Sequence, residues 1–161
     1  MRAVLDYCAE GLPRSIAATA ILIREGETTG HLFVLAEGKL EVVKGDTVVA
    51  TICEPGAIVG EMSALLDQPY SATVRAVTNA KVYEFADPNA FFRSQPEVAL
   101  LVAQMLAQRL NVATTYLADI KRQYAGHGNH LAMVGDVLES MINSPASKAT
   151  PGSDRLPDPR M

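Results

Sequence analysis

The sequence has few of the residues that several protein classes require. Its 161 residues contain no tryptophan and only two cysteines, Cys8 and Cys53. Both cysteines lie in apolar surroundings without a second thiol or a histidine nearby, so the sequence indicates two buried free thiols and no zinc knuckle. No apolar run reaches the roughly 18 residues that span a bilayer, and the first residues lack the layout of a signal peptide. We therefore expect a soluble, cytoplasmic protein with no membrane partner.

An excess of positive charge is missing as well. The formal net charge is -4 and the pI is near 5.3, so the chain has no broad basic field for nucleic acid. A phosphodiester ligand would have to be bound by a local site. The length and the 48% hydrophobic content suit one ordinary core and not two. One domain with appendages is the expected organisation.

Short β-type runs separated by turn residues fill the first half of the chain. They follow a short helix expected within residues 1–10, with Val4 and Cys8 on one face, and they begin near Ser15. A turn about every eight residues predicts an antiparallel sandwich or barrel. The later runs cover residues 20–23, 31–35, 40–43, 48–52, 71–76 and 81–85.

The stretch of residues 60–74, which we call the cassette, differs from the strands around it. Gly60 and Glu61 open a short apolar helical turn, a bend with Pro69 follows, and a β-type run leads away. Glycine lets a ligand approach the backbone, and amides at the start of a helix attract anions. The cassette therefore predicts a phosphate site. Alternatively, Glu61 only stabilises the positive end of the helix and Gly60 only turns the chain.

The last third of the sequence is helical in pattern. Asp87 and Pro88 are typical of a helix start, and no glycine or proline interrupts the chain between Pro96 and about Tyr124. One apolar stripe of this long helix is spaced for a partner helix and comprises Ala99, Ala103, Leu106, Leu110, Ala113, Leu117, Ile120 and Tyr124. A second stripe, expected to face the chain's own barrel, comprises Leu101, Val102, Met105, Val112 and Tyr116. The two stripes predict either a dimer seam or one wide buried face.

A further helix and a tail complete the chain. Residues 126–128 interrupt the long helix, and Asn129 can cap a second helix that reaches Asn143. Residues 144–161 are rich in proline and poor in apolar residues, which predicts a disordered tail. The expected boundaries are a domain at 1–124, a helical extension at 125–143 and the tail at 144–161.

Several fragments in register resemble the cyclic nucleotide-binding domain family, which includes catabolite-activator-type regulators and regulatory subunits of cAMP-dependent kinase. The fragments are Arg24-Glu25-Gly26-Glu27, Leu35-Ala36-Glu37-Gly38, Pro55-Gly56, Gly60-Glu61 and Ala72-Thr73-Val74-Arg75-Ala76, and residues 90–110 look like its B and C helices. The resemblance implies a mainly β fold with flanking helices. This fold is an eight-stranded antiparallel jelly-roll β-barrel followed by a short helix, a long helix and one extra C-terminal helix.

The resemblance also implies roles for residues of the cassette. The Glu61 carboxylate would accept the ribose 2′-hydroxyl, which suits a strong acceptor that does not compete as a donor. The Ser71 hydroxyl would meet the phosphate or the purine. Main-chain amides would face the cyclic phosphate and ribose at Gly60, Met62, Ser63 and Ala72.

Tyr70 departs from the family, which places a phosphate-binding arginine at this position. A tyrosine offers one neutral donor in place of paired charged ones. Losing a hydrogen bond to a charged group costs about 1.5–3 kcal/mol, or roughly ten- to a hundredfold in affinity. Arg24 or Arg75 could compensate by reaching the site, or the ligand could stack on the Tyr70 ring.

These observations predict a stand-alone regulatory or sensor module, not an enzyme, that binds cAMP or cGMP without a cofactor. The alternative is a degenerate domain that serves as an interaction or dimerisation scaffold. A minor alternative is a cupin-type metalloenzyme using His31 and Glu37, but such a site needs further histidines, and His127 and His130 lie in the helical part. The helix to Asn143 carries no lysine or arginine, so no DNA-binding module is expected. The expected partners are a second copy, through residues 96–124, and a separate effector protein.

Overall fold

The computed structural model describes residues 2–125 and 130–143. Its elements, in chain order, are η1 (Arg2–Tyr7), β1 (Leu12–Ile16), β2 (Ile21–Ile23), β3 (Leu32–Glu37), β4 (Leu40–Lys44), β5 (Thr47–Ile52), β6 (Ile58–Val59), α1 (Glu61–Leu66), β7 (Thr73–Ala76), β8 (Ala80–Phe85), α2 (Pro88–Ser94), α3 (Pro96–Gln123) and α4 (His130–Asn143). No helix in this part of the chain is long and apolar enough to cross a membrane. The predicted tail at 144–161, the interruption at 126–128 and the Asn129 cap fall outside the described residues.

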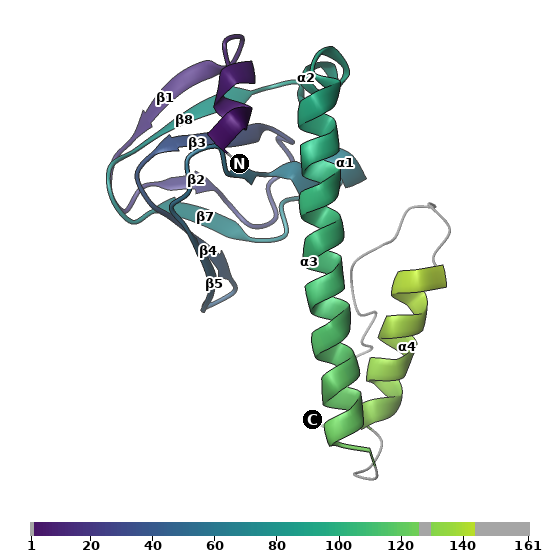
Figure 1. Ribbon diagram of the computed structural model, residues 1–161. Coiled ribbons are helices and arrows are strands. Elements are labelled where there is room, and N and C mark those ends of the chain that lie inside the picture. The colour runs from purple at the N-terminus through teal and green to yellow at the C-terminus, as the bar shows by residue number, and fades with distance from the viewer. Residues whose placement is uncertain (1, 126–129, 144–161) are drawn as a thin grey trace. The chain divides into compact units, whose positions relative to one another are not determined.

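The eight strands form two four-stranded antiparallel sheets, which confirms the mainly β jelly roll (Figure 1). One sheet has the order β1-β8-β3-β6 and the other the order β2-β7-β4-β5. Strands distant in sequence therefore pair, as β3 does with β8 and β4 with β7. The pairing of β3 with β6 brings the start of β3 to the first residues of the cassette, and the pairing of β4 with β7 brings the end of β4 to its last residues.

Two details of the strands differ from the prediction. β6 was not predicted as a strand, because it has only two residues, both buried, and shows no alternation. β1 begins at Leu12 and includes Pro13, whereas the sequence suggested a start near Ser15. Proline is tolerated there because β1 is at the edge of its sheet.

Both faces of β3 are buried, and each face belongs to a different hydrophobic cluster. Phe33 and Leu35 pack between the two sheets, while Leu32 and Val34 pack against the N-terminal and helical elements. Alternate residues of a strand point to opposite faces, so β3 holds the two clusters together. The second cluster also contains Val4 and Cys8 of the N-terminal segment, whose buried face is confirmed although its helix is of the 3-10 type.

Helix α2 starts where the sequence predicted. The Asp87 carboxylate accepts a hydrogen bond from the Ala90 amide at 2.9 Å, and Pro88 occupies the first turn. The Phe91 ring stacks on Phe85 at the end of β8, with the ring centroids 3.9 Å apart. These contacts join α2 to the sheet that contains β3.

The long helix α3 belongs to two compact units, residues 1–107 and 108–161. In the first unit, Val98 and Val102 are fully buried, and residues of both predicted stripes pack around them. In the second unit, Val112 and Tyr116 are 63% and 66% exposed. Both stripes therefore contribute to one apolar face in the first turns of α3, as one of the two predicted alternatives has it.

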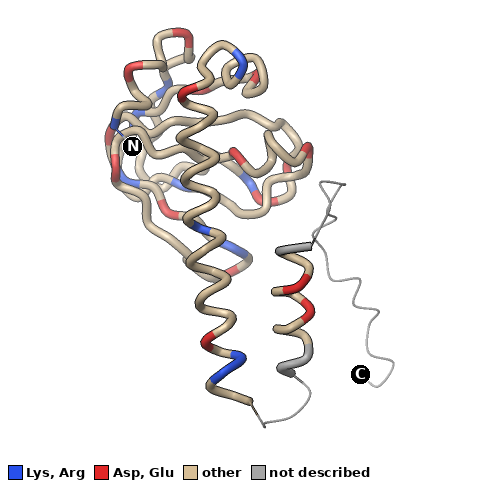
Figure 2. Tube along the Cα trace, turned by 45° about the vertical axis from the view of Figure 1, so that its right-hand side comes forward, with Lys and Arg blue, Asp and Glu red and all other residues tan. Residues whose placement is uncertain are grey.

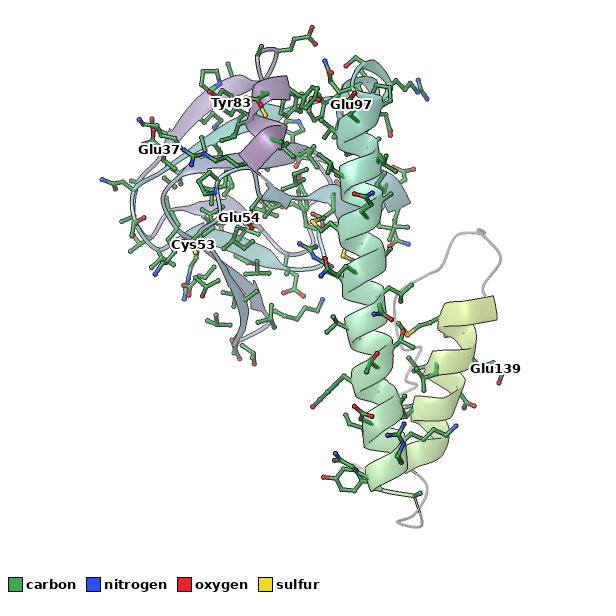
Figure 3. The ribbon with its side chains drawn as sticks, viewed as in Figure 1. Glu37, Cys53, Glu54, Tyr83, Glu97 and Glu139 are labelled. Atoms are coloured by element: carbon green, nitrogen blue, oxygen red, sulfur yellow. The ribbon has the colours of Figure 1, made fainter. Side chains whose placement is uncertain are left out.

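The two cysteines lie in different environments. Cys8 is buried, and burial raises the pKa of its thiol to about 11. Cys53 is exposed, which corrects the prediction of two buried thiols (Figure 3). It directly follows β5, an edge strand whose own residues are mostly exposed.

Candidate functional site

The cassette begins at a glycine that no other residue can replace without strain. Gly60 has φ +88° and precedes α1, and a Cβ atom there would lie 2.6 Å from the His31 carbonyl oxygen. A left-handed backbone and the absence of side-chain space both require glycine. The close approach also fixes the cassette against the start of β3.

The residues after Gly60 divide between the interior and the surface. The Glu61 and Ser63 side chains are buried, at 5% and 6% exposure, whereas Met62 is 47% exposed. The Ser63 hydroxyl donates to the Gln68 carbonyl at 2.5 Å, and the Gln68 amide donates to the Ser63 carbonyl. The Ser63 hydroxyl therefore stabilises the turn of the cassette. The Glu61 side chain is buried in the protein.

Tyr70 is a buried residue with a fully used hydroxyl. The side chain is 5% exposed, and its ring lies next to Gly60. Its hydroxyl donates to the His31 carbonyl at 2.7 Å and accepts from the Thr29 hydroxyl at 3.1 Å. Burial raises the pKa of the phenol, so the group stays neutral. At the position where the resemblance implies a charged arginine, Tyr70 instead joins the cassette to the core.

The structure does not place Arg24 or Arg75 where either could take the role of the arginine that the resemblance implies at position 70. Arg75 is exposed on the outer face of β7, where it pairs with Glu41, because Val74 and Ala76 occupy the inner face. Arg24 lies 3.8 Å from Glu27 in an exposed pair. Stacking a ligand on Tyr70 would require its ring to leave the core.

Lys44 is a cassette neighbour that the sequence did not reveal. Its ammonium donates to the main-chain carbonyl of Ser71, whose own side chain is exposed, and it pairs with Glu25. The contact joins residues 27 positions apart, and nothing in the local pattern of β4 points to it. Only the alternation from Leu40 through Val42 could have placed Lys44 on the inner face. Figure 2 shows that Lys and Arg are interspersed with Asp and Glu along the chain. The positive charge of Lys44 is therefore not part of a larger basic surface.

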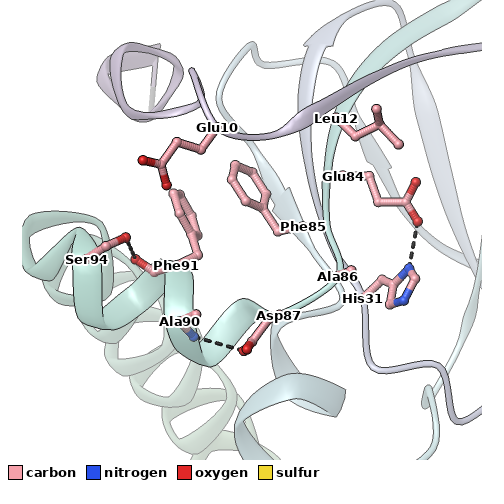
Figure 4. A pocket seen from close by; sticks show the side chains of 10 residues that line it. All are labelled: Glu10, Leu12, His31, Glu84, Phe85, Ala86, Asp87, Ala90, Phe91 and Ser94. Carbon is pink, nitrogen blue, oxygen red and sulfur yellow. Dashed lines mark hydrogen bonds and ion pairs between the residues drawn. The ribbon is translucent and has the colours of Figure 1, made fainter.

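A cavity of about 530 Å³ lies on the other side of His31, between β1, the end of β8 and α2 (Figure 4). The His31 Nδ1 atom is 2.6 Å from the Glu84 carboxylate, which also accepts from Arg14 at 3.0 Å. Burial opposes ionisation of Glu84, but the hydrogen bonds from His31 and Arg14 outweigh it and lower the pKa of the carboxyl. The backbone of His31 thus binds the cassette while its ring binds β8.

His31 and Glu37, the pair considered for a cupin-type site, do not converge. Glu37 is the last residue of β3 and His31 precedes the first, so the two lie roughly 20 Å apart along the strand. Glu37 pairs with Lys81 at 3.0 Å, and His31 pairs with Glu84. No group of three or more potential metal-binding side chains occurs among the residues that the structure describes.

A family model described as the cyclic nucleotide-binding domain matches residues 13–104, more than half of the chain. The chain belongs to the cyclic nucleotide-binding domain family. The matched region begins in β1 and ends in the first half of α3, so it includes both sheets and the cassette.

Curated relatives of this cyclic nucleotide-binding domain are much longer proteins. Human cGMP-dependent protein kinase 2 is 36% identical over 70 residues, which are 44% of this chain and 9% of the kinase. A cyclic nucleotide-gated potassium channel of Mesorhizobium japonicum is 31% identical over 104 residues, which are 63% of this chain and 28% of the channel. The chain therefore spans less than a third of the length of either relative.

Solved structures share the fold. The catabolite activator protein of Thermus thermophilus superposes with a TM-score of 0.64 at 20% identity, over 88% of this chain and 82% of that protein. A protein of a cyclic-GMP-dependent signalling pathway in bacterial phytopathogenesis gives a TM-score of 0.60 at 24% identity, over 69% and 94% of the two chains. Both likenesses show that the domain has the jelly roll of the family.

Replacing the Tyr70 hydroxyl tests its structural role. Tyr70→Phe keeps the ring but deprives the His31 carbonyl of its donor, and we expect a loss of about 1–2 kcal/mol in the free energy of unfolding. Urea denaturation measures the loss. Tyr116→Phe is the matched control, since Tyr116 is 66% exposed and should change stability by less than about 0.5 kcal/mol. Equal effects of the two substitutions would contradict the anchoring role.

The Glu84 carboxylate predicts a pH-dependent contribution to stability. Its pKa is lower in the folded chain than in the unfolded chain, so its stabilisation is complete above the unfolded value of about 4.3 and is lost as the pH falls through the folded value. Glu84→Gln should cost about 1–2 kcal/mol at pH 7 and progressively less as the pH falls from about 5 to 3. Thermal melts over this range, with exposed Glu37→Gln as the control, measure the difference. A difference that does not change with pH would show that the ionised carboxylate is not responsible.

Proposed function

We propose that this chain is a regulatory module that binds a cyclic nucleotide, cAMP or cGMP, at the cassette. The observation that carries the proposal is the pair Gly60 and Glu61, a left-handed glycine without side-chain space followed by a buried carboxylate. A carboxylate at a fixed, buried position is a strong hydrogen-bond acceptor that does not compete as a donor, which suits the recognition of a ribose hydroxyl. Membership of the family supports the same role.

The proposed contacts follow the cassette. The Glu61 carboxylate accepts the ribose 2′-hydroxyl, and the Ser71 hydroxyl contacts the phosphate or the purine. Main-chain amides of Gly60, Met62, Ser63 and Ala72 face the cyclic phosphate and the ribose. Tyr70 does not touch the ligand. Its hydroxyl positions the cassette by donating a hydrogen bond to the His31 carbonyl.

Two kinds of relatives support a regulatory role. The kinase and the channel named above carry cyclic nucleotides in their names, and each contains a region similar to this chain. The family is a binding domain, so the chemistry of such proteins would reside elsewhere, and we propose that this chain passes its signal to a separate effector. A ligand that contacts the cassette more favourably in one arrangement of α1 and α2, which touch each other, shifts the population toward that arrangement.

A scaffold without nucleotide binding is the second candidate. The observation that favours it is the buried Tyr70, whose neutral hydroxyl is already engaged by His31 and Thr29. In that case the domain would serve interaction or dimerisation, and the cassette would be a structural element only.

Titration with cyclic nucleotides separates the two candidates. The sensor predicts that cAMP or cGMP raises the melting temperature in a dose-dependent way, because a ligand that binds only the folded chain stabilises it. Calorimetry should then show that Glu61→Ala weakens binding by about tenfold or more, since it removes the acceptor for the ribose hydroxyl.

Tyr70→Arg is the complementary variant. It should tighten binding by roughly ten- to a hundredfold by restoring a charged donor, while lowering the stability of the protein without nucleotide because the core loses a buried ring. The absence of any melting shift at millimolar nucleotide, in the original chain and in Tyr70→Arg alike, would leave the scaffold as the function.

We also propose a homodimer through α3 within residues 96–124. Leu110, which belongs to the stripe spaced for a partner helix, is 46% exposed, and no glycine or proline follows Pro96 within α3. If this face pairs with a second copy, Leu110→Glu should convert a dimer to a monomer in light scattering, since burying an unpaired charge is costly. Arg109→Glu would change the charge of the same turn without touching the apolar stripe. A mass that corresponds to a monomer for the original chain would exclude the seam.

A further inference from the structure

We propose that the Lys44 ammonium and the Gly45 amide form the anion-binding pair of this domain in place of the missing arginine. The Glu25 carboxylate occupies this pair in the structure and must give way to the phosphate of a ligand. The identity of that ligand rests on the cyclic nucleotide function proposed above. The pair itself is argued from contacts around β4.

The register of the sheet places Lys44 on the side where the cassette lies. In the pairing of β4 with β7, Leu40 lies opposite Ala76, and Val42 lies opposite Val74. Leu40 and Ala76 are buried, and Val42 packs on the same core cluster. Side chains alternate along a strand, so Lys44 is the next inward position of β4.

This alternation is undisturbed on β4 itself. The irregularity between β4 and β5 pairs Val42 with Ala50 and Val43 with Val48, which leaves the extra residue, Val49, on β5. A bulge changes the direction of side chains on the strand that contains it. Lys44 therefore lies one residue beyond Val43, the last residue of β4 that pairs with β7, and extends toward the end of the cassette.

The contacts of Lys44 and Gly45 already describe a bound anion. The Lys44 ammonium is 3.2 Å from one Glu25 oxygen, and the Gly45 amide donates to the other at 3.0 Å. These donors hold the two oxygens of one carboxylate, as they would two oxygens of a phosphodiester. The hydrogen bond from Gly45 and that from Lys44 lower the pKa of Glu25, so the bound group is an anion.

The same ammonium also contacts the cassette directly. Lys44 donates to the Ser71 carbonyl, and the Glu25 amide donates to the Thr73 hydroxyl at 3.1 Å. Lys44 thus contacts the residue before Ala72, and the backbone of Glu25 contacts the residue after it. The Ala72 amide is proposed to face the phosphate. Releasing Glu25 would free the charge of Lys44 at the place where the cassette lacks one.

Exchange of one anion for another explains how a domain with Tyr70 can bind a cyclic phosphate, and it predicts opposite effects of two substitutions. Lys44→Met removes the cation and should weaken nucleotide binding by about three- to tenfold, a modest factor because the side chain is 57% exposed. Glu25→Gln removes the competing anion and should strengthen binding by about two- to fivefold.

A second exposed pair offers matched controls. Lys81 and Glu37 are 3.0 Å apart, with exposures of 61% and 67%, on β8 and β3. Lys81→Met and Glu37→Gln make the same changes of charge away from the cassette and should alter affinity by less than about twofold. Calorimetry with cAMP and cGMP on the full chain compares the four variants.

A second probe separates this inference from the proposed function. Dimethyl phosphate has the phosphodiester anion without a base or ribose, and its titration is followed through the amide signals of Gly45 and Ser71 by nuclear magnetic resonance. Shifts that occur in the original chain, grow in Glu25→Gln and vanish in Lys44→Met support the pair even if no nucleotide binds, which would refute only the sensor function. Nucleotide binding that Lys44→Met leaves unchanged refutes the pair and retains the function. Failure of both probes refutes both.

Discussion

The hydrogen bond from the Tyr70 hydroxyl to the His31 carbonyl is the contact on which the arrangement of the cassette depends. It connects the end of the cassette to the residue that precedes β3, at the point where Gly60 brings the start of the cassette against the same carbonyl. Both ends of the cassette thus meet one backbone group. The Tyr70 phenol, at the position where the resemblance implies an arginine, makes a structural contact and carries no charge.

Much of this fold could be predicted from the sequence because its signals are local. Asp87 and Pro88 started α2 as expected, since an N-cap and a first-turn proline act within a few residues. The exposure of Cys53 and of Tyr116 could not be predicted in this way. Whether an apolar residue is covered depends on which strand is at a sheet edge and where a helix leaves the core.

The features of the candidate site also differ in whether a local sequence pattern could predict them. Gly60 and Glu61 were evident because glycine and acid at the start of a helix are a local pattern, and the resemblance to the family placed them in context. The burial of Tyr70 and the approach of Lys44 to Ser71 come from strand pairing across many residues. The resemblance therefore predicted that a charge is lacking at position 70, whereas nothing in the sequence revealed the contact of Lys44 with Ser71.

The double burial of β3 has a mechanical consequence. Leu32 and Val34 belong to one hydrophobic cluster and Phe33 and Leu35 to the other, so a shift of this strand would disturb both at once. The strand that is buried on both faces is therefore the one to which the cassette is hydrogen-bonded. A ligand-induced movement that leaves β3 in place would have to occur away from it, and the exposed side of α1, with Met62, Leu65 and Leu66, has the fewest packing contacts to lose.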